Sequence, residues 1–499
     1  MRVLIASSEM VPFAKTGGLA DVCGALPIEL AKRGDEVVVF LPAYPGIHEA
    51  NIPIEETEIE FQIPIGSKMV SGQLLKATLP NSNVIIYFVH QPSYFYRDGL
   101  YQFAGEDFKD NCERFVFFNR FLLDSLSQLN WYPDVIHCND WQTSLIPAYL
   151  KTTHSGQSSF KEIASLLTIH NLAYQGNFWH WDMLLTGIDW QYFNWRQMEF
   201  YGRLNLLKTG IVFADAISTV SPRYALEIQT PEQGCGLESV LLERSESLTG
   251  ILNGIDTQVW NPRTDEHLAC NYDVNDWQTG KAKCKADLQS ILNLPAEPTQ
   301  PVIGIVGRLA TQKGWSLILE VMRHWLQHNA QVQWAILGTG DPAYQQTLQQ
   351  LQKQWPDSVG LKLAFSDKLA HQIEAGADIF LMPSQYEPCG LNQLYSMQYG
   401  TVPVVHETGG LADTVVDCTQ QNLADKTANG FLFKHYHTRA LEEALSRAVH
   451  TFTHQATWNQ LVENGMRRDW SWTSSANQYR QLYRSIAKTE NTTPESAKS

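Results

Sequence analysis

Residues 301–314 have the sequence PVIGIVGRLATQKG, a short apolar run followed by a turn that carries glycine, arginine and lysine. The preceding residues 295–301, PAEPTQP, are rich in proline and are typical of a turn. Further apolar runs follow at intervals of helical length, near residues 334–338, 361–365, 379–382 and 402–405. Because strands that alternate with helices form a parallel sheet, residue 302 is predicted to open a second α/β domain.

The N-terminal half shows the same alternation. Residues 3–6 form an apolar run, a glycine-containing turn follows, and apolar side chains recur at helical spacing over residues 19–30. Residues 58–87 alternate apolar and polar side chains with a period of two, which predicts added hairpins. Further apolar runs lie near residues 135–137, 166–169 and 216–218. The first domain is therefore also predicted to be α/β.

The composition is that of a folded, acidic protein. The chain has 499 residues, which at roughly 150 residues per domain corresponds to about three domains, or to two large ones. Lys and Arg number 37 and Asp and Glu number 52, so the net charge of −15 makes nucleic acid or an anionic membrane a poor match as main partner. The eight cysteines include no Cys-x-x-Cys pair, which argues against a zinc ribbon or a redox site.

The N-terminal apolar run, residues 1–6, is too short for a signal peptide or a membrane span. A cytoplasmic location is expected, and the removal of a plastid transit peptide is left open. Reduced cysteines are likewise expected.

The turn that leaves the first strand of each predicted domain carries glycine and lysine. In residues 15–18, KTGG, backbone N–H groups and the helix N-terminus favour an anion, and Lys15 adds a positive charge. In residues 307–314, GRLATQKG, Arg308 and Lys313 lie at the carboxyl end of a parallel sheet, which suits a pyrophosphate. Taken singly, each turn is equally compatible with an ordinary loop that carries surface cations.

Polar residues also follow other predicted strands. Glu387, in the stretch EPCGL at 387–391, is placed to bond sugar hydroxyls or a cationic transition state, or simply to favour a helix start. Cys389 beside it is expected to be a packed small residue rather than a reactive thiol. His170 ends an apolar strand and, taken alone, is expected to be structural. The aromatic residues at 178–201 are expected to serve a core more than to stack on sugar rings.

Together these residues resemble the bacterial glycogen synthase and plant starch synthase family of retaining glucosyltransferases. The motifs that carry the resemblance occur in the family's order and are residues 15–22 (KTGGLADV), 170–176 (HNLAYQG), 250–256 (GILNGID), 307–309 (GRL), 313–314 (KG) and 387–391 (EPCGL). The resemblance implies the α/β GT-B architecture, in which two Rossmann-like, doubly wound domains face a central cleft. The implied domains are residues 1–262, joined by a C-terminal helix at about 470–487, and residues 263–469; residues 488–499 are expected to form a disordered tail.

The resemblance also implies a reaction. Glucose is transferred from ADP-glucose to the non-reducing 4-hydroxyl of an α-1,4-glucan, such as glycogen, starch or a maltooligosaccharide, with retention of configuration and without a metal or other cofactor. The implied catalytic residues are His170 beside the anomeric carbon, Arg308 and Lys313 at the leaving diphosphate, and Glu387 at the sugar hydroxyls. The implied substrate-binding residues are Lys15, Gly17, Gly18, Asp21, Asp140, Asn171, Asn253, Cys389, Gly390 and Leu391. No oligomeric state follows from it.

Two positions depart from the wider pattern of retaining families. Tyr395 stands where broader families have a second glutamate, so the ribose contact of that carboxylate is not implied here. Asn392 stands where many relatives have threonine. Two other classes of function remain open: a phosphorylase, which needs a pyridoxal phosphate lysine and a longer chain, and a non-catalytic glucan-binding or priming protein of the same fold. The preference for ADP over UDP rests on the resemblance alone.

Overall fold

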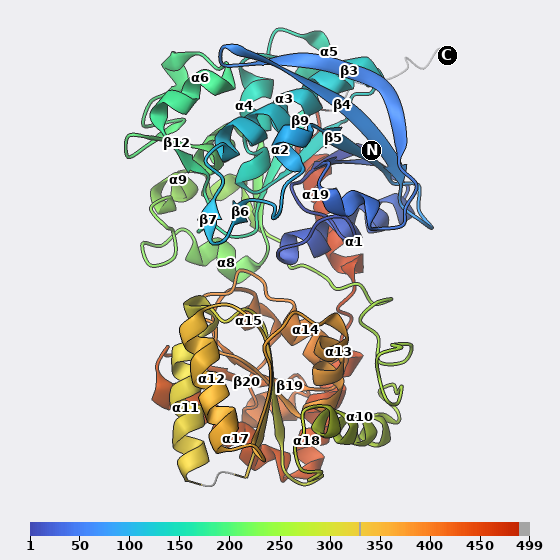
Figure 1. The fold of residues 1–499 in the computed structure, drawn as a ribbon, viewed down its shortest axis with the longest axis vertical. Coiled ribbons are helices and arrows are strands. Elements are labelled where there is room, and N and C mark those ends of the chain that lie inside the picture. Colours follow the sequence, from blue (N-terminus) through green and yellow to red (C-terminus); the bar gives the residue numbers. More distant parts are fainter. Residues whose placement is uncertain (329–330, 489–499) are drawn as a thin grey trace, which may run out of the picture. The chain divides into compact units, whose positions relative to one another are not determined.

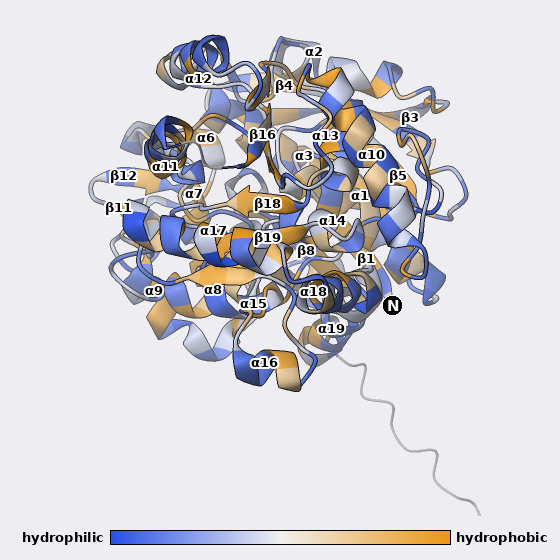
Figure 2. Cartoon of the chain, turned by 90° about the horizontal axis from the view of Figure 1, so that it is seen from below, coloured by the Kyte–Doolittle hydropathy of each residue, from blue (hydrophilic) through white to orange (hydrophobic). Residues whose placement is uncertain are grey.

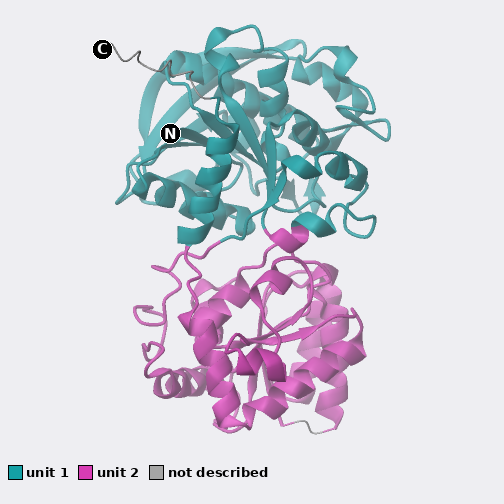
Figure 3. Cartoon of the chain, turned by 180° about the vertical axis from the view of Figure 1, so that it is seen from behind, with its two compact units in different colours: residues 1–220, 225–253, 472–499 teal, residues 221–224, 254–471 magenta. Residues whose placement is uncertain are grey.

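The computed structural model describes residues 1–328 and 331–488 and divides into two compact units (Figure 3). Unit 1 comprises Met1–Val220, Ala225–Asn253 and the residues from Trp472 onward, and unit 2 comprises Ser221–Tyr224 and Gly254–Ser471. The sequence led us to expect the division after residue 262, whereas it falls between Asn253 and Gly254. The expected tail at 488–499 lies, apart from its first residue, outside the described residues.

Unit 1 is built on a nine-stranded sheet with the order β14-β13-β9-β8-β1-β2-β5-β4-β3 (Figure 1). Its strands are β1 (Arg2–Ala6), β2 (Glu36–Pro42), β3 (Glu55–Ile65), β4 (Lys68–Thr78), β5 (Ile85–His90), β8 (Val135–Asn139), β9 (Ala164–Ile169), β13 (Ala216–Thr219) and β14 (Leu248–Gly250). All neighbouring pairs are parallel except β3 with β4 and β4 with β5. The hairpin expected within residues 58–87 is thus β3 and β4, while the last part of that stretch joins the parallel sheet as β5.

Helices and short strands complete unit 1. The helices are α1 (Gly18–Lys32), α2 (Pro92–Phe95), α3 (Asn111–Leu129), α4 (Leu145–Lys151), α5 (Ser158–Lys161), α6 (Met183–Thr186), α7 (Leu206–Phe213), α8 (Pro222–Glu227, which runs across the division of the units), α9 (Glu238–Glu243) and α19 (Trp472–Ile486). The short strands are β6 (Gln102–Phe103), β7 (Glu106–Asp107), β10 (Asn177–Phe178), β11 (Glu199–Phe200) and β12 (Arg203–Asn205). The core lies between α1, α19 and the central strands.

Unit 2 has a six-stranded, entirely parallel sheet with the order β17-β16-β15-β18-β19-β20. Its strands are β15 (Val302–Val306), β16 (Gln333–Leu337), β17 (Val359–Lys362), β18 (Ile379–Met382), β19 (Val402–His406) and β20 (Phe431–Phe433). Its helices are α10 (Trp277–Ile291), α11 (Trp315–Gln327), α12 (Pro342–Gln354), α13 (Asp367–Gly376), α14 (Asn392–Gln398), α15 (Gly409–Thr414), α16 (Gln420–Ala424), α17 (Thr438–Phe452) and α18 (Gln455–Arg467). The prediction that β15 opens a second α/β domain is confirmed.

The hydropathy pattern explains why these segments take these forms. Strands β18 and β19 are hydrophobic along their length, whereas helix α12 is largely hydrophilic (Figure 2). A strand inside a parallel sheet is covered on both faces and therefore needs apolar side chains on both. Helix α17 buries only Leu441, Ala444, Leu445 and Ala448, a spacing that forms one apolar stripe.

Candidate active site

Asp140 and His170, both named from the sequence, and Glu9, which was not, lie where three neighbouring strands of unit 1 end. Strands β1, β8 and β9 are parallel and adjacent, so their carboxyl ends lie at the same edge of the sheet. Glu9 follows β1, Asp140 follows β8 and His170 follows β9. All three are buried. Ligands of doubly wound folds bind at such an edge, which makes this cluster a candidate ligand-binding site of unit 1.

The turn at residues 15–18 is held from within the protein. The carboxylate of Glu9 accepts hydrogen bonds from the backbone N–H groups of Thr16 at 2.6 Å and Gly17 at 3.2 Å. It also accepts from the Thr16 hydroxyl at 2.6 Å and the Tyr101 hydroxyl at 2.8 Å. Two of the N–H groups that were expected to favour an external anion are therefore already taken by a side chain that the sequence analysis did not single out.

Lys15 and the glycines of the turn are exposed. The Lys15 ammonium lies 2.6 Å from the carboxylate of Asp21, which is in the first turn of α1. A Cβ atom added at Gly17 would meet no atom within 4 Å, so the space beside the turn is open. Helix α1 begins at Gly18. The turn therefore presents a lysine and open space beside Gly17, while two of its backbone N–H groups are bound to Glu9.

His170 is held as a neutral imidazole. Its Nε2 lies 2.9 Å from Oδ1 of Asn139, whose amide nitrogen donates to the carbonyls of Ala6 and His137. Because Asn139 Oδ1 can only accept, Nε2 of His170 carries the proton and Nδ1 keeps its lone pair. Burial lowers the pKa of His170 to about 3, which leaves the ring uncharged near neutral pH.

Asp140 fixes the backbone that carries His170. Its carboxylate accepts from the His170 N–H at 2.7 Å, and its φ of 55° is in the left-handed region. Such backbone is strained for a residue with a side chain and is found most often at functional sites. Burial raises the pKa of Asp140 to about 7, against the lowering effect of hydrogen bonds from the His170 and Asn171 N–H groups.

Two asparagines of unit 1 were also named from the sequence. Asn171 Oδ1 accepts from the backbone N–H of Ala173 at 3.1 Å. Asn253 follows β14, and its Oδ1 is buried without a hydrogen-bond partner among the described residues. A buried amide oxygen without a partner is costly, and a ligand hydroxyl would satisfy it.

A separate candidate site lies in unit 2, where the loop after β15 meets the loop after β18. Lys313 Nζ lies 2.6 Å from Oε2 of Glu387, and Ser384 donates to the same oxygen at 3.0 Å. Gly314 has a φ of 81°, and a Cβ there would lie 2.1 Å from the carbonyl oxygen of Pro383, so only glycine fits. Arg308 is exposed on the same loop. The structure thus joins Lys313 and Glu387 and leaves Arg308 open to solvent.

The EPCGL loop is packed against the first turn of α15. The N–H of Gly410 donates to the carbonyl oxygens of Glu387 at 3.2 Å and Pro388 at 3.1 Å. A Cβ at Gly410 would lie 2.2 Å from the carbonyl oxygen of Cys389, so the close packing of this loop on α15 needs glycine at 410. The Cys389 side chain is buried, which agrees with a packed small residue. Gly390 has a φ of 71°, and Leu391 precedes α14.

The two positions that depart from the wider family pattern have structural roles. Tyr395 is buried and stacks on Trp260, with ring centroids 3.7 Å apart and planes inclined by 10°. Trp260 stacks in turn on His371. Asn392 donates to the carbonyl oxygen of Val306 at 2.9 Å. Tyr395 therefore packs inside unit 2 and does not replace the missing carboxylate.

The expectation that the aromatic residues at 178–201 serve a core is wrong for most of the large rings. Trp195 is 71% exposed, Trp179 60% and Tyr201 84%, and Trp181 and Trp190 are also exposed. This segment consists of short turns and two- or three-residue strands, which provide no continuous face to cover the rings. Smaller apolar residues, among them Met198, are buried instead.

Metal sites and membrane spans are both absent from the part of the chain that the structure describes. No group of three or more His, Cys, Asp or Glu side chains there is arranged to hold a metal ion. Likewise, within the described ranges, every helix is too short or too polar to cross a membrane.

Comparison with known proteins gives consistent similarities along the chain. Residues 2–243 match a family model described as the starch synthase catalytic domain, and residues 291–465 match one described as glycosyl transferases group 1. The chain is 47% identical over 493 residues to a glycogen synthase of Rhodopirellula baltica, covering 97% of each protein. It is 43% identical to a glycogen synthase of Syntrophotalea carbinolica, covering 97% of this chain and 98% of that protein.

Solved structures show the same likeness. The catalytic domain of starch synthase IV from Arabidopsis thaliana, bound to ADP and acarbose, superposes with a TM-score of 0.89 at 34% identity, covering 98% of this chain and 99% of that one. A sucrose-phosphate synthase from Thermosynechococcus elongatus has a TM-score of 0.59 at 18% identity, covering 97% and 98%, and shares the fold.

Proposed function

Because the chain belongs to the glycogen synthase and starch synthase family of glycosyltransferases, we propose that it transfers glucose from ADP-glucose to an α-1,4-glucan. The acceptor group is the 4-hydroxyl at the non-reducing end, and the anomeric configuration is retained. The observation that carries this proposal is identity of 47% to a glycogen synthase over almost the whole of both chains. The ADP and acarbose bound by the similar starch synthase IV support a nucleotide and a glucan-like chain as ligands.

We assign the leaving diphosphate to Arg308 and Lys313. Charge builds up on the diphosphate as the glycosidic bond breaks, and fixed cations placed to meet it lower the energy of the transition state. The Glu387 carboxylate, 2.6 Å from Nζ, restricts the Lys313 side chain to one direction before the donor binds. Glu387 itself is assigned to the sugar hydroxyls, which its second oxygen can accept from.

We assign the glucosyl group to the cluster in unit 1 that contains Asp140 and His170. The transition state of a retaining transfer resembles an oxocarbenium ion, which is positively charged. Burial keeps the His170 imidazole neutral, so the ring can line the site without repelling that charge. The buried Oδ1 of Asn253 is suited to accept a hydrogen bond from a sugar hydroxyl. Lys15, beside the open Gly17, is assigned to the donor phosphates or the sugar.

Retention without a covalent intermediate is proposed to follow a front-face route. The departing phosphate oxygen accepts the proton of the acceptor hydroxyl, which attacks from the side that the diphosphate leaves. This route needs neither an enzymatic nucleophile nor a metal ion, since Arg308 and Lys313 supply the positive charge. We accordingly propose that the reaction runs without a cofactor.

The test is incorporation of radiolabelled glucose into glycogen by the purified, metal-chelated protein, with ADP-glucose and UDP-glucose supplied separately. Incorporation from ADP-glucose, with release of ADP, is expected. The Arg308→Ala variant serves as the matched control, because this exposed side chain can be removed without disturbing the core, and it should lose most of the activity. Incorporation mainly from UDP-glucose would overturn the donor assignment. Activity that returns only when Mg²⁺ is added would overturn the metal-free route.

A further inference from the structure

Glu9 occupies the position at which the turn of residues 15–18 would otherwise hold an anion. It is 4% exposed. Its Oε2 accepts both backbone N–H groups, of Thr16 and Gly17, while its Oε1 accepts both hydroxyls, of Thr16 and Tyr101. One carboxylate oxygen of Glu9 therefore binds the backbone of the turn, and the other binds two hydroxyl groups.

Tyr101 fixes Glu9 from the other side. Its hydroxyl donates to Glu9 at 2.8 Å, and the Ser8 hydroxyl lies 2.7 Å away and donates in turn. The backbone carbonyl of Tyr101 accepts from the N–H of Phe108 at 3.0 Å and from the side-chain amide of Asn111 at 2.9 Å. Tyr101 is thus anchored at its backbone as well as at its ring.

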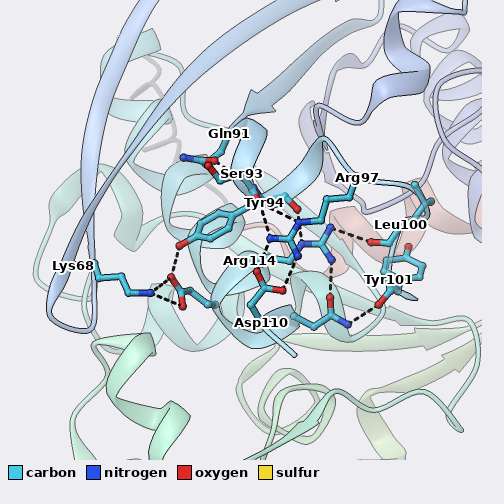
Figure 4. A network of polar contacts seen from close by, with 11 residues as sticks. Lys68, Gln91, Ser93, Tyr94, Arg97, Leu100, Tyr101, Asp110 and Arg114 are labelled. Atoms are coloured by element: carbon cyan, nitrogen blue, oxygen red, sulfur yellow. Dashed lines mark hydrogen bonds and ion pairs between the residues drawn. The ribbon is translucent and has the colours of Figure 1, made fainter. Parts of the chain in front are cut away.

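The anchor behind Tyr101 is the buried Arg114, the centre of the network in Figure 4. Its guanidinium donates to Asn111 Oδ1 at 2.6 Å and to the backbone carbonyls of Tyr94 at 2.6 Å and Leu100 at 3.1 Å. Arg114 is fully buried, and these contacts are made to neutral oxygens. Figure 4 also shows Arg97 paired with Asp110, and Tyr94 and Lys68 near the same centre. The Tyr94 hydroxyl and the Lys68 ammonium both contact the carboxylate of Glu113.

We propose that Glu9 is a positioning residue for the transfer reaction and acts through the turn that carries Lys15. The chain of contacts runs from Arg114 through Asn111 and Tyr101 to Glu9, and from Glu9 to the backbone on which Lys15 sits. It holds the turn in one conformation before substrate arrives, which lowers the entropy cost of aligning Lys15 with the donor. The proposal rests on the proposed function for its kinetic consequence, but not for its structural one.

The structural consequence is tested by proteolysis, which needs no substrate. Trypsin cleaves after lysine, and Lys15 is exposed in the turn. In Glu9→Ala, cleavage after Lys15 in the native protein is expected to be about 10-fold faster, because the turn opens once its hydrogen bonds to a charged group are lost. Cleavage after Lys68 is the internal control and should not change. Equal acceleration at both lysines would mean general destabilisation and would overturn the proposal, as would no acceleration at Lys15.

The kinetic consequence separates hydrogen bonding from charge. Glu9→Gln keeps an acceptor for the two N–H groups and places an amide N–H₂ toward two hydroxyls, which can both accept. We expect Glu9→Ala to lower kcat about 100-fold with little change in KM for ADP-glucose, and Glu9→Gln to stay within about 3-fold of the unmodified protein. Equal loss in both variants would show that the charge itself is required and would overturn the positioning role.

Two further comparisons complete the test. If Glu9 acts through Lys15, the double variant Glu9→Ala/Lys15→Ala should be no slower than Lys15→Ala alone; additive losses would contradict this. Tyr101→Phe should lower kcat about 10-fold, whereas Tyr94→Phe, which removes a hydroxyl from the far side of the same network, should not. These milder variants keep the test open should Glu9→Ala fail to fold. Absence of transfer by the unmodified protein would refute the proposed function, and the proteolysis result would still decide the role of Glu9.

Discussion

At the scale of single residues, the strongest assignment is the pair of Lys313 and Glu387, which brings together two loops that are 74 residues apart in sequence. Because this ion pair forms when the protein folds, the loss of side-chain freedom at Lys313 occurs before the donor binds. Both residues were named from the sequence. Their contact was not, because nothing in either loop alone indicates which strand end it faces.

Replacement of Lys313 by alanine is expected to lower kcat about 100- to 1,000-fold, the usual effect of removing one preorganised charge-stabilising donor. Steady-state kinetics with ADP-glucose and glycogen measure it. Arg439→Ala is the control, since Arg439 also forms an ion pair in unit 2 but is exposed on helix α17. Unchanged turnover by a folded Lys313→Ala variant would refute the assigned role.

Asp140 predicts a dependence of stability on pH. Burial raises its pKa to about 7, so between about pH 4 and pH 7 the unfolded chain releases a proton that the folded chain retains. The free energy of unfolding therefore falls as the pH rises through this window, by at most about 1.4 kcal/mol per pH unit, and levels off above it.

Asp140→Asn lacks this contribution, while its Oδ1 can still accept from the His170 N–H. Urea unfolding of both proteins at several pH values gives the difference between their free energies of unfolding. As the pH rises from 4 to 7, the free energy of unfolding of the unmodified protein should fall relative to that of Asp140→Asn. A constant difference would contradict the raised pKa.

Glu9 shows which residues sequence reasoning missed. The turn at residues 15–18 was recognised from its glycines and its place before a helix. The carboxylate that fills it depends on Tyr101, 92 residues further along the chain, and on the packing around Arg114. Contacts of that range leave no local pattern, although a glutamate three residues after an apolar strand is a signal that could have been followed.

At the scale of elements, helix α19 closes the core of unit 1. Trp472, Ala476, Tyr479 and Tyr483 are buried on one face, and Tyr483 lies 2.8 Å from Nδ1 of the buried His137 in β8. The apolar stripe is visible in the sequence. Its destination in unit 1 came from the family resemblance, since a stripe does not say which sheet it covers.

Tyr479→Ala is expected to cost about 3 to 5 kcal/mol in the free energy of unfolding of unit 1, as for other large aromatic side chains removed from a core. Chemical denaturation measures it. Gln478→Ala, one residue earlier on the exposed face, should change stability by less than about 0.5 kcal/mol. Equal effects of the two substitutions would mean that the helix is not docked as described.

The tryptophans at 179–195 were expected to be buried in a core, but the structure places them at the surface. Exposed aromatic rings are suited to stack on sugar rings. Trp195→Ala is expected to raise KM for glycogen about 3- to 10-fold while leaving KM for ADP-glucose unchanged. This change corresponds to the binding free energy of about one ring-stacking contact.

The matched control is Leu242→Ala, an exposed apolar residue of unit 1 without a ring. It should leave both KM values unchanged. A Trp195→Ala variant with normal KM for glycogen would exclude this ring from acceptor binding.

At the scale of the whole molecule, the alternation of apolar runs and helical segments was enough to predict two α/β units. Both sheets are formed largely of parallel strands whose residues are buried on both faces. Such strands need apolar side chains on both faces, and they therefore appear in the sequence as continuous apolar runs. The residues at which the chain passes from one unit to the other could not be predicted from the apolar runs. That Ser221–Tyr224 belongs to unit 2 and that the chain re-enters unit 1 at Trp472 depend on contacts between residues far apart in sequence.

The most direct test of the whole account is the structure of the product. The purified protein is supplied with ADP-glucose carrying ¹³C at the anomeric carbon and with a short maltooligosaccharide, and the new linkage is read by NMR. The account predicts one α-1,4-linked glucose at the non-reducing end for each ADP released. A β linkage, or release of ADP with free glucose as the only sugar product, would contradict it.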